Sequence, residues 1–263
     1  MKALIVNDDG VDSPGLAALA RVAVEAGLDV RVAAPHIERS GASAALTALE
    51  ADGKLEVSRR SIEGLPDVEV LAVHGSPALI TFVASYGAFG EIPDIVLSGI
   101  NLGPNTGRAI LHSGTVGAAL TGGVNDACGL AVSLDVGLDP SAYHWDTAAA
   151  VVRRLIPVLL EHPRGTVFNV NVPNVPLDTE VDVREATLAP FGIVQTTMTE
   201  PIEGNVRLTV RELPDDPIEG TDAALLAAGF ATITNVVAVQ QASKPVFTGP
   251  RREKGALHVD GSS

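Results

Sequence analysis

Short apolar segments alternate with longer amphipathic segments along the first two-thirds of the chain, and this alternation limits the fold more than any other feature. The apolar segments are rich in Val, Ile, Leu and Ala, which is typical of buried strands. They cover residues 2–6, 29–34, 68–73, 94–97 and 130–134. Because strands that alternate with helices are joined by right-handed crossovers, the pattern predicts an α/β fold with a mostly parallel sheet flanked by helices.

Three of the intervening segments open with the same helix-start signal, a short polar residue followed by proline. The polar residue suits the N-cap position, and proline suits the first helical turn because its φ is already fixed. The three pairs are Ser13-Pro14, Ser76-Pro77 and Asp139-Pro140. They predict helices that run from Pro14 to Gly27, over residues 78–86 and over residues 142–161.

After Pro163 the regular alternation of strand-like and helix-like segments ends. A further strand is expected at 166–172, and the pieces 181–188, 193–197 and 205–211 are separated by Pro and Gly, as in antiparallel strands or an extended arm. A short capped helix at 223–228 and a strand at 231–239 follow. We therefore predict one α/β domain over residues 1–239, with a hairpin arm at about 190–212, and a mobile tail at 240–263.

Composition excludes several classes of function. The net charge of −14 disfavours contact with nucleic acid polymers and with anionic membranes. Cys128 is the single cysteine, so no internal disulfide can form and a reduced, cytoplasmic setting is expected. No signal peptide and no membrane span are expected either, because every apolar run is too short.

Two adjacent acids, Asp8 and Asp9, follow the first predicted strand directly. In an open α/β sheet, ligands bind at the carboxyl ends of the strands, so both acids point to a site. Two carboxylates ~4 Å apart repel each other by about 4 kcal/mol at an effective dielectric constant near 20. Solvent, a shared proton or a divalent cation must offset this repulsion, and we favour the cation over a turn with solvated acids.

Three further loops follow predicted strands and carry polar groups suited to such a site. Ser40, beside Gly41, offers a hydroxyl, and the Gly- and Asn-rich segment 98–107 offers amide oxygens for a hard cation or backbone amides for an anion. Residues 113–117 open a predicted helix whose free amides suit a phosphate. Each loop alone also fits an ordinary turn or N-cap, and Arg39 and Arg108 fit either a phosphate clamp or a solvated surface. Together the loops favour a metal–phosphate site.

These motifs, taken as an ordered set, closely resemble the SurE (survival protein E) family of metal-dependent 5′/3′-nucleotidases over roughly residues 1–235. The matching segments are Asn7-Asp-Asp-Gly10, Ser13-Pro-Gly-Leu16, Arg39-Ser-Gly-Ala-Ser43, Ser98-Gly-Ile-Asn101, Ser113-Gly-Thr-Val-Gly-Ala118, Asn169-Val-Asn-Val-Pro173 and Glu219-Gly-Thr-Asp222. The resemblance implies a Rossmann-like core, one Mg²⁺ or Mn²⁺ ion per subunit, and release of phosphate from nucleoside monophosphates. It also implies a homodimer or homotetramer formed through an exchanged hairpin.

Site residues carry over from the resemblance by motif position. The metal would be held by Asp8, Asp9, Ser40 and Asn101. The phosphate would be surrounded by Asn105, Ser113, Gly114 and Thr115. Asp8 is also the candidate to orient or deprotonate the attacking water, a role that the sequence does not separate from direct metal ligation.

Some positions depart from the family's pattern and keep an alternative open. Leu79 stands where the family commonly has an acid, and Arg108 stands where an acid is frequent. A non-catalytic phosphate or nucleotide sensor on the same scaffold is therefore the alternative function. A receiver domain is a poor match because the third strand ends in His74-Gly75 without a phospho-acceptor aspartate. Phosphatases of the haloacid-dehalogenase type are also a poor match, because Gly10 stands where they need a second aspartate.

Overall fold

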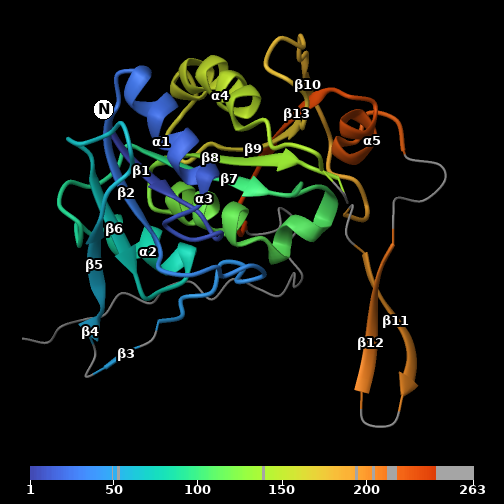
Figure 1. The fold of residues 1–263 in the computed structure, drawn as a ribbon, viewed down its shortest axis with the longest axis horizontal. Helices are drawn as coiled ribbons and strands as arrows, with labels where there is room; N and C mark the ends of the chain where they lie inside the picture. Colours follow the sequence, from blue (N-terminus) through green and yellow to red (C-terminus); the bar gives the residue numbers. More distant parts are fainter. Residues whose placement is uncertain are drawn as a thin grey trace, which may run out of the picture.

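The computed structural model describes residues 1–48, 50–51, 54–137, 140–192, 195–202, 205–211 and 218–240. A nine-stranded sheet runs through the body in the order β10-β13-β9-β8-β7-β1-β2-β6-β5 (Figure 1). The strands from β9 to β6 are parallel to one another, while β5 and β13 are antiparallel to their neighbours β6 and β9. The sheet strands are β1 (Lys2–Val6), β2 (Asp29–Pro35), β5 (Val57–Arg60), β6 (Glu69–Val73), β7 (Ile95–Leu102), β8 (Cys128–Asp135), β9 (Val167–Pro173), β10 (Val183–Glu185) and β13 (Ala231–Val236). The mostly parallel sheet confirms the predicted fold class.

Helices cover both faces of this sheet. One face carries α1 (Pro14–Glu25) and α4 (Trp145–Leu160), which pack on each other. The other carries α2 (Pro77–Ala84) and α3 (Gly114–Val124), as the two sides of the sheet in Figure 1 show. The 3₁₀ helix η1 (Gly107–His112) precedes α3, and α5 (Asp222–Ala227) precedes β13. Because both faces are covered, β8 and β9 are buried along nearly their whole length, and their buried residues are mostly apolar apart from Ser133, Asn169 and Asn171.

Local signals predicted the first elements closely. The strand β1 has the predicted bounds, and α1 begins at Pro14 with Ser13 as its N-cap, where the Ser13 hydroxyl accepts from the Leu16 amide. Gly27 follows the end of this helix with a φ of 79°, a conformation that suits glycine.

The predicted end of the fourth strand was wrong. We expected a loop from Ser98 onward, but β7 continues to Leu102 and pairs with Ser133 and Leu134 of β8 after a register shift that follows Ser98. Such a shift inserts extra residues into one strand and turns its side chains to a new direction. The Gly- and Asn-rich composition hid this continuation, which the neighbouring strand stabilises.

The predicted start of α4 was wrong as well. The helix begins at Trp145 with His144 at the N-cap, instead of shortly after Pro140. The side chain of Asn174 accepts from the His144 amide and donates to the Ala142 carbonyl, and these bonds hold residues 142–144 outside the helix. Asp139 lies outside the described residues.

The strand β5 and the short pair β3 (Glu50–Ala51) and β4 (Lys54–Leu55) were not predicted. The edge strand β5 is mostly exposed and polar, so it lacks the apolar run on which strand prediction depends.

Two strands, β11 (Gln195–Ile202) and β12 (Asn205–Arg211), form an antiparallel hairpin that projects from the body in Figure 1. Their pairing from Gln195 to Arg211 confirms an antiparallel extension within the predicted arm at about 190–212. The predicted tail from residue 241 onward lies outside the described residues. Within the part of the chain that is described, no helix combines the length and the apolar character that a membrane span requires.

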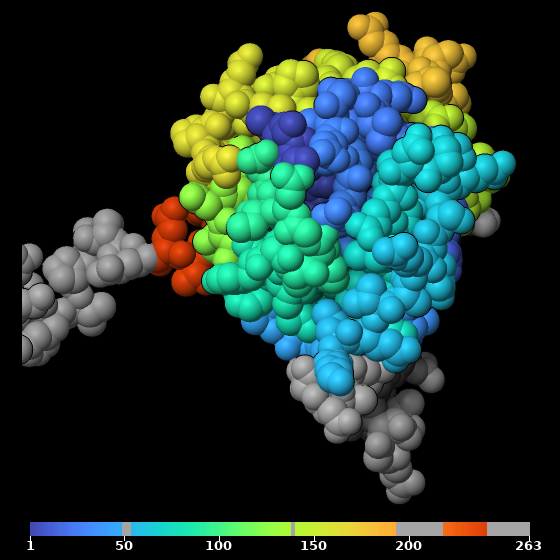
Figure 2. Space-filling model, turned by 90° about the vertical axis from the view of Figure 1, so that its left-hand side faces the viewer, coloured from blue at the N-terminus to red at the C-terminus, as the bar shows by residue number. Residues whose placement is uncertain are grey.

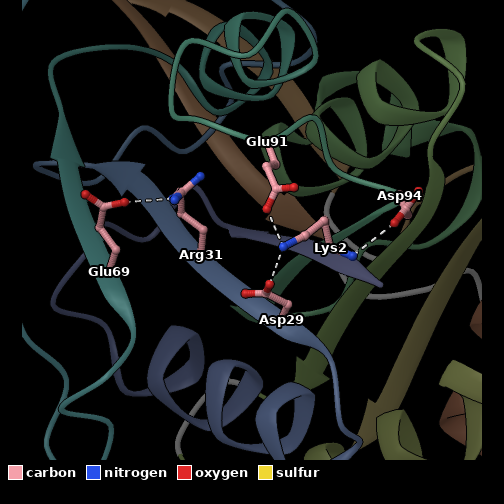
Figure 3. Close-up of polar contacts among 6 residues, drawn as sticks. All are labelled: Lys2, Asp29, Arg31, Glu69, Glu91 and Asp94. Carbon is pink, nitrogen blue, oxygen red and sulfur yellow. Dashed lines mark hydrogen bonds and ion pairs between the residues drawn. The ribbon is translucent and has the colours of Figure 1, made fainter.

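Ion pairs join the amino-terminal ends of the parallel strands. The Lys2 ammonium pairs with Asp29 and Glu91, its backbone amide donates to Asp94 over 3.0 Å, and Arg31 pairs with Glu69 (Figure 3). Figure 2 views the molecule from this side, where the N-terminal segment is framed by residues of the cyan and green parts of the sequence. The pairing lowers the pKa of Asp29, chiefly through the hydrogen bond from Lys2. The acidic side chains at this end of the sheet are therefore paired with basic side chains or hydrogen-bond donors.

Candidate active site

Asp8 lies at the opposite, carboxyl-terminal end of the sheet, immediately after β1. Its side chain is buried, and the hydroxyl of Thr115 donates a hydrogen bond to it. Burial raises the pKa of Asp8, while the Thr115 hydroxyl and then the backbone amides of Thr115 and Gly114 act to lower it. The N-terminus of α3 therefore stabilises the charged form of this carboxylate.

Only glycine permits this approach of α3 to Asp8. A Cβ atom at Gly114 would lie 2.7 Å from Asp8 Oδ2 and 2.9 Å from Asp8 Cβ, closer than real Cβ contacts come. The preceding Ser113 is the N-cap of α3, and its hydroxyl accepts from the Val116 amide over 3.1 Å. The structure thus places Ser113, Gly114 and Thr115 at the start of α3, with Gly114 and Thr115 bonded to Asp8 itself, while their predicted contact with a phosphate stays a prediction.

The turn between β1 and α1 is shaped by Asn7, the residue before the acid pair. The Asn7 side-chain amide donates to the Gly10 carbonyl over 3.0 Å and to the Ser13 hydroxyl over 2.7 Å. Gly10 adopts a φ of 99° beneath the following loop, where Ile37 would lie 3.3 Å from a Cβ atom. The local sequence therefore fixes the direction of both Asp8 and Asp9.

Asp9 is half-buried, and one of its carboxylate oxygens accepts from the Leu102 amide over 3.2 Å. Burial raises the pKa of Asp9 to about 6, and the neighbouring charges of Asp8 and Glu38 act in the same direction. Within the described residues, neither Asp8 nor Asp9 forms an ion pair with a lysine, arginine or histidine. The negative charge at this end of the sheet is therefore uncompensated, unlike that at the amino-terminal end.

Ser40 lies on the loop after β2, which passes beside Asp8. The Arg39 amide donates to the Asp8 carbonyl over 2.7 Å, and this bond joins the two loops. The Ser40 hydroxyl is exposed and donates to Glu38 Oε1 over 2.7 Å. The buried Nε of Arg39 has no hydrogen-bond partner among the residues described, whereas Arg108 is exposed.

Asn101 lies on β7 just after the register shift, one residue before the amide that binds Asp9. Its side-chain nitrogen donates to the Gly103 carbonyl over 2.6 Å, which leaves its side-chain oxygen as a potential ligand. The extended strand thus places Asn101 one residue before the amide that binds Asp9, and its role as a metal ligand stays a prediction.

Asn105 is held by a set of polar side chains from β8 and β9. Its side chain donates to the Ser133 hydroxyl over 2.8 Å, and its backbone amide donates to Asn171 Oδ1 over 2.7 Å. Its carbonyl accepts from the side chains of Asn169 and Asn171, each over 2.9 Å. Sequence reasoning assigned no role to Ser133 or to the two strand asparagines, although their period-two spacing on β9 was a usable signal.

Asp222 is another residue whose role sequence reasoning missed. Its fully buried carboxylate accepts from the amides of Gly107 over 2.7 Å and Ala189 over 2.9 Å, and also from Ala223 at the start of α5. Burial raises its pKa, against the effect of these amides. Asp222 therefore ties the start of η1, two residues after Asn105, to the segment that leads into the β11–β12 hairpin.

The donors at the acid pair fit a divalent cation of the hard type. Carboxylates, an amide oxygen and a hydroxyl are the ligands that Mg²⁺, Mn²⁺ and Ca²⁺ prefer. The pKa of Asp9 is raised by burial first and by the Asp8 charge second, and a cation bound here would oppose both effects. Across the described residues no group of three or more His, Cys, Asp or Glu side chains is arranged for a metal, so a cation here needs the neutral oxygens as well.

Comparisons with known proteins identify the family to which the chain is similar. The sequence profile described as Survival protein SurE matches residues 3–195. A protein named 5′/3′-nucleotidase SurE from Edwardsiella ictaluri is 37% identical over 239 residues, which cover 89% of each chain. One of the same name from Shigella dysenteriae is 41% identical over 180 residues, 68% of this chain and 66% of that relative. The crystal structure of SurE from Aquifex aeolicus superposes with a TM-score of 0.71 at 28% identity, over 90% of this chain and 93% of that one. The chain therefore belongs to the SurE family.

Proposed function

We propose that the protein is a metal-dependent 5′/3′-nucleotidase, which hydrolyses nucleoside monophosphates to nucleoside and phosphate. The names of the relatives support nucleotidase activity. The observation that carries the proposal is the uncompensated Asp8–Asp9 pair, which lies against the N-terminus of α3 and beside Asn101. Burial and the neighbouring Asp8 charge raise the pKa of Asp9, so a ligand of opposite charge is the simplest reason for placing two acids side by side here.

In this proposal, Asp8, Asp9, Ser40 and Asn101 hold one Mg²⁺ or Mn²⁺ ion. When bound, the ion polarises the phosphoryl group and offsets the negative charge that develops on it. The fixed hydrogen bond from Thr115 keeps Asp8 in one orientation, as a preorganised site requires.

The chain's own groups supply the remaining steps. Asp8 orients a water molecule and accepts its proton as the water oxygen attacks phosphorus and the ester P–O bond breaks. Asn105 and the Ser113 hydroxyl contact the phosphoryl oxygens from the side of α3 and η1. The departing nucleoside oxygen takes up the proton that Asp8 accepted, so nucleoside and phosphate are the products and the Asp8 carboxylate is charged again.

Phosphate release from adenosine 5′- and 3′-monophosphate tests the proposal, with Mn²⁺ or Mg²⁺ supplied and with a chelator as the control. We expect turnover that the chelator abolishes, and we expect Asn101→Ala to lose it while circular dichroism stays unchanged. Tight binding of the nucleotide without any turnover would instead support the sensor function. The departure from the family's pattern at Leu79, which packs against Gly75 at the start of α2, is what keeps that alternative in view.

Three further properties stay predictions. They are the assembly into a homodimer or homotetramer, the cytoplasmic setting, and the single domain over residues 1–239. Light scattering of the purified chain, with and without residues 195–211, measures the first of these directly.

A further inference from the structure

Two buried asparagines of β9 face away from the main core. Asn169 and Asn171 alternate with Phe168, Val170 and Val172 along the strand. The three apolar residues pack in the core with side chains of α1 and α4, whereas the asparagines lie on the opposite face of the strand, toward α3. Both asparagines are fully buried. Two amides at these positions therefore need a reason other than core packing.

The side chain of Asn171 binds both polar groups of one backbone residue. Its Oδ1 accepts from the Asn105 amide over 2.7 Å, and its Nδ2 donates to the Asn105 carbonyl over 2.9 Å. The Nδ2 of Asn169 donates to the same carbonyl, also over 2.9 Å. Two bonds to one residue fix its orientation as well as its position, as a bidentate pair does. The backbone of Asn105 is therefore held by side chains of β9.

This arrangement lowers stability at one point. The Oδ1 of Asn169 is buried and has no hydrogen-bond partner among the residues described. An unpaired buried acceptor is unfavourable, and an aliphatic side chain of similar size would avoid the loss. Buried polar groups that lower stability are expected mainly at functional sites. The benefit of Asn169 therefore lies in its bond to Asn105.

The side chain of Asn105 is oriented as well. Its nitrogen donates one hydrogen to the Ser133 hydroxyl over 2.8 Å. An amide nitrogen carries two hydrogens, so the second can donate to a phosphoryl oxygen. Two residues earlier, the Gly103 amide donates to the Leu134 carbonyl of β8 over 3.0 Å, which joins the loop to the end of the sheet just before Asn105. The second hydrogen therefore has a defined direction.

Asn171 also belongs to a row of polar residues that crosses three strands. Asn101 of β7 pairs in register with Ser133 of β8, and Ser133 pairs with Asn171 of β9. The three strands are neighbours in the sheet (Figure 1), and strands lie roughly 4.8 Å apart, so the row spans about 10 Å. One end of the row is the proposed metal ligand Asn101, and the other end holds Asn105. The sheet, rather than the glycine-rich loop, therefore sets the distance between these two residues.

We propose that Asn171, assisted by Asn169, is a positioning residue of the phosphate site, which fixes Asn105 relative to Asn101 before the substrate binds. The inference rests on the proposed function and adds to it residues that act through Asn105 without touching the substrate. A site that is fixed in advance loses little free energy to rearrangement during the reaction, so a loss of this hold should lower the rate of hydrolysis.

Kinetics with two variants of β9 test the proposal. Asn171→Ala should lower kcat/KM for adenosine monophosphate about 100-fold, the size expected when a positioned group moves by about 1 Å. It should leave the Kd for Mn²⁺ unchanged, because Asn171 bonds to Asn105 and not to a proposed metal ligand. Val170→Ala is the matched control, since it removes buried atoms from the opposite face of the same strand; it should lower stability but change kcat/KM less than about threefold. Equal losses of kcat/KM in the two variants would overturn the proposal.

Asn171→Asp provides a readout that a merely structural role would not move. A protonated carboxyl group can accept from the Asn105 amide and donate to the Asn105 carbonyl, as the native amide does, whereas a carboxylate has no hydrogen to donate. Burial favours the protonated form at low pH. The ratio of kcat/KM in this variant to that in the wild type should therefore fall about tenfold from about pH 5.5 to about pH 8.5. The same ratio at both pH values would contradict the role of the paired bonds.

Calorimetric titration of inorganic phosphate into the Mg²⁺-loaded protein separates this inference from the proposed function. Asn171→Ala should raise the Kd for phosphate about tenfold, and Val170→Ala should leave it unchanged. Absence of turnover with adenosine monophosphate, together with this rise in Kd, would refute the nucleotidase activity and support the positioning role. Turnover in the wild type with an unchanged Kd and an unchanged kcat/KM in Asn171→Ala would refute the positioning role alone. A wild type that neither binds phosphate nor hydrolyses the ester would refute both.

Discussion

Replacing Asp9 with asparagine should stabilise the metal-free protein at neutral pH. The folded pKa of Asp9 is about 6, compared with an ordinary value of 3.8, so the native state binds a proton more tightly than the unfolded chain does. The corresponding stability is fully present below about pH 3.8 and is lost as pH rises through about 6. At pH 7.5 the wild type has lost it, whereas the asparagine of the Asp9→Asn variant never carries the charge and can still accept from the Leu102 amide.

The size of the effect follows from the same pKa difference. At about 1.4 kcal/mol per pKa unit, the difference corresponds to about 3 kcal/mol as an upper limit, and solvent at this half-buried carboxylate reduces it. Other acids have the opposite effect, since the pKa of Asp29 and of Asp94 is lowered by hydrogen bonds at the amino-terminal end of the sheet. These groups are common to both proteins, so they cancel in the difference between wild type and variant.

Urea unfolding at intervals from pH 4 to pH 8, with a chelator present, measures this difference. We expect the free energy of unfolding of Asp9→Asn to exceed that of the wild type by about 1–3 kcal/mol at pH 7.5 and the gap to close toward pH 4. Mn²⁺ at 100-fold excess over its Kd should close or reverse this gap, because it adds about 2.7 kcal/mol to the protein that binds it. A variant that is less stable than the wild type at pH 7.5 in chelator would refute the account of an uncompensated charge.

Three other substitutions test the contacts around this pair. Thr115→Val removes the hydroxyl donor to the buried Asp8 and should lower the free energy of unfolding by about 2 kcal/mol in urea titrations, whereas Thr115→Ser should retain most of it. Gly114→Ala forces a methyl group against Asp8, so kcat for adenosine monophosphate should fall about 100-fold while circular dichroism shows an intact fold. Turnover at the wild-type rate would contradict the close approach of α3 to Asp8. Asp222→Asn places an amide nitrogen against a backbone donor such as the Gly107 amide, so the free energy of unfolding should fall by about 2 kcal/mol and the KM for adenosine monophosphate should rise. An unchanged KM would show that η1 does not depend on this carboxylate.

Elements that depend on local signals were predictable from the sequence. An apolar run specifies β1, and the Ser13-Pro14 pair specifies the start of α1, because both signals act within a few residues of where they are read. The beginning of α4 was not predictable in this way. The side chain that holds residues 142–144 outside the helix belongs to Asn174, which lies far along the chain.

The same distinction applies to the site. The order of strands and loops predicted that Asp8, Asn101 and Thr115 would meet, because loops at the carboxyl ends of neighbouring parallel strands share one edge of the sheet. It did not predict that Thr115 would donate to Asp8, since the anion that a helix N-terminus faces depends on how the helix packs. The hydrogen bonds that position Asn105, and those that Asp222 accepts, likewise depend on tertiary contacts between distant segments.

The two acids of the pair are not equivalent. One carboxylate is held in a fixed position, and the other is free to change its charge when a ligand binds. The Thr115 hydroxyl at the N-terminus of α3 donates to Asp8, so this carboxylate is held in place before any ligand binds, although burial still raises its pKa. Asp9 receives one backbone hydrogen bond and keeps a raised pKa, so its charge is the part that a cation must complete. A cation that binds at Asp9 would therefore meet a site whose other carboxylate is already held in position.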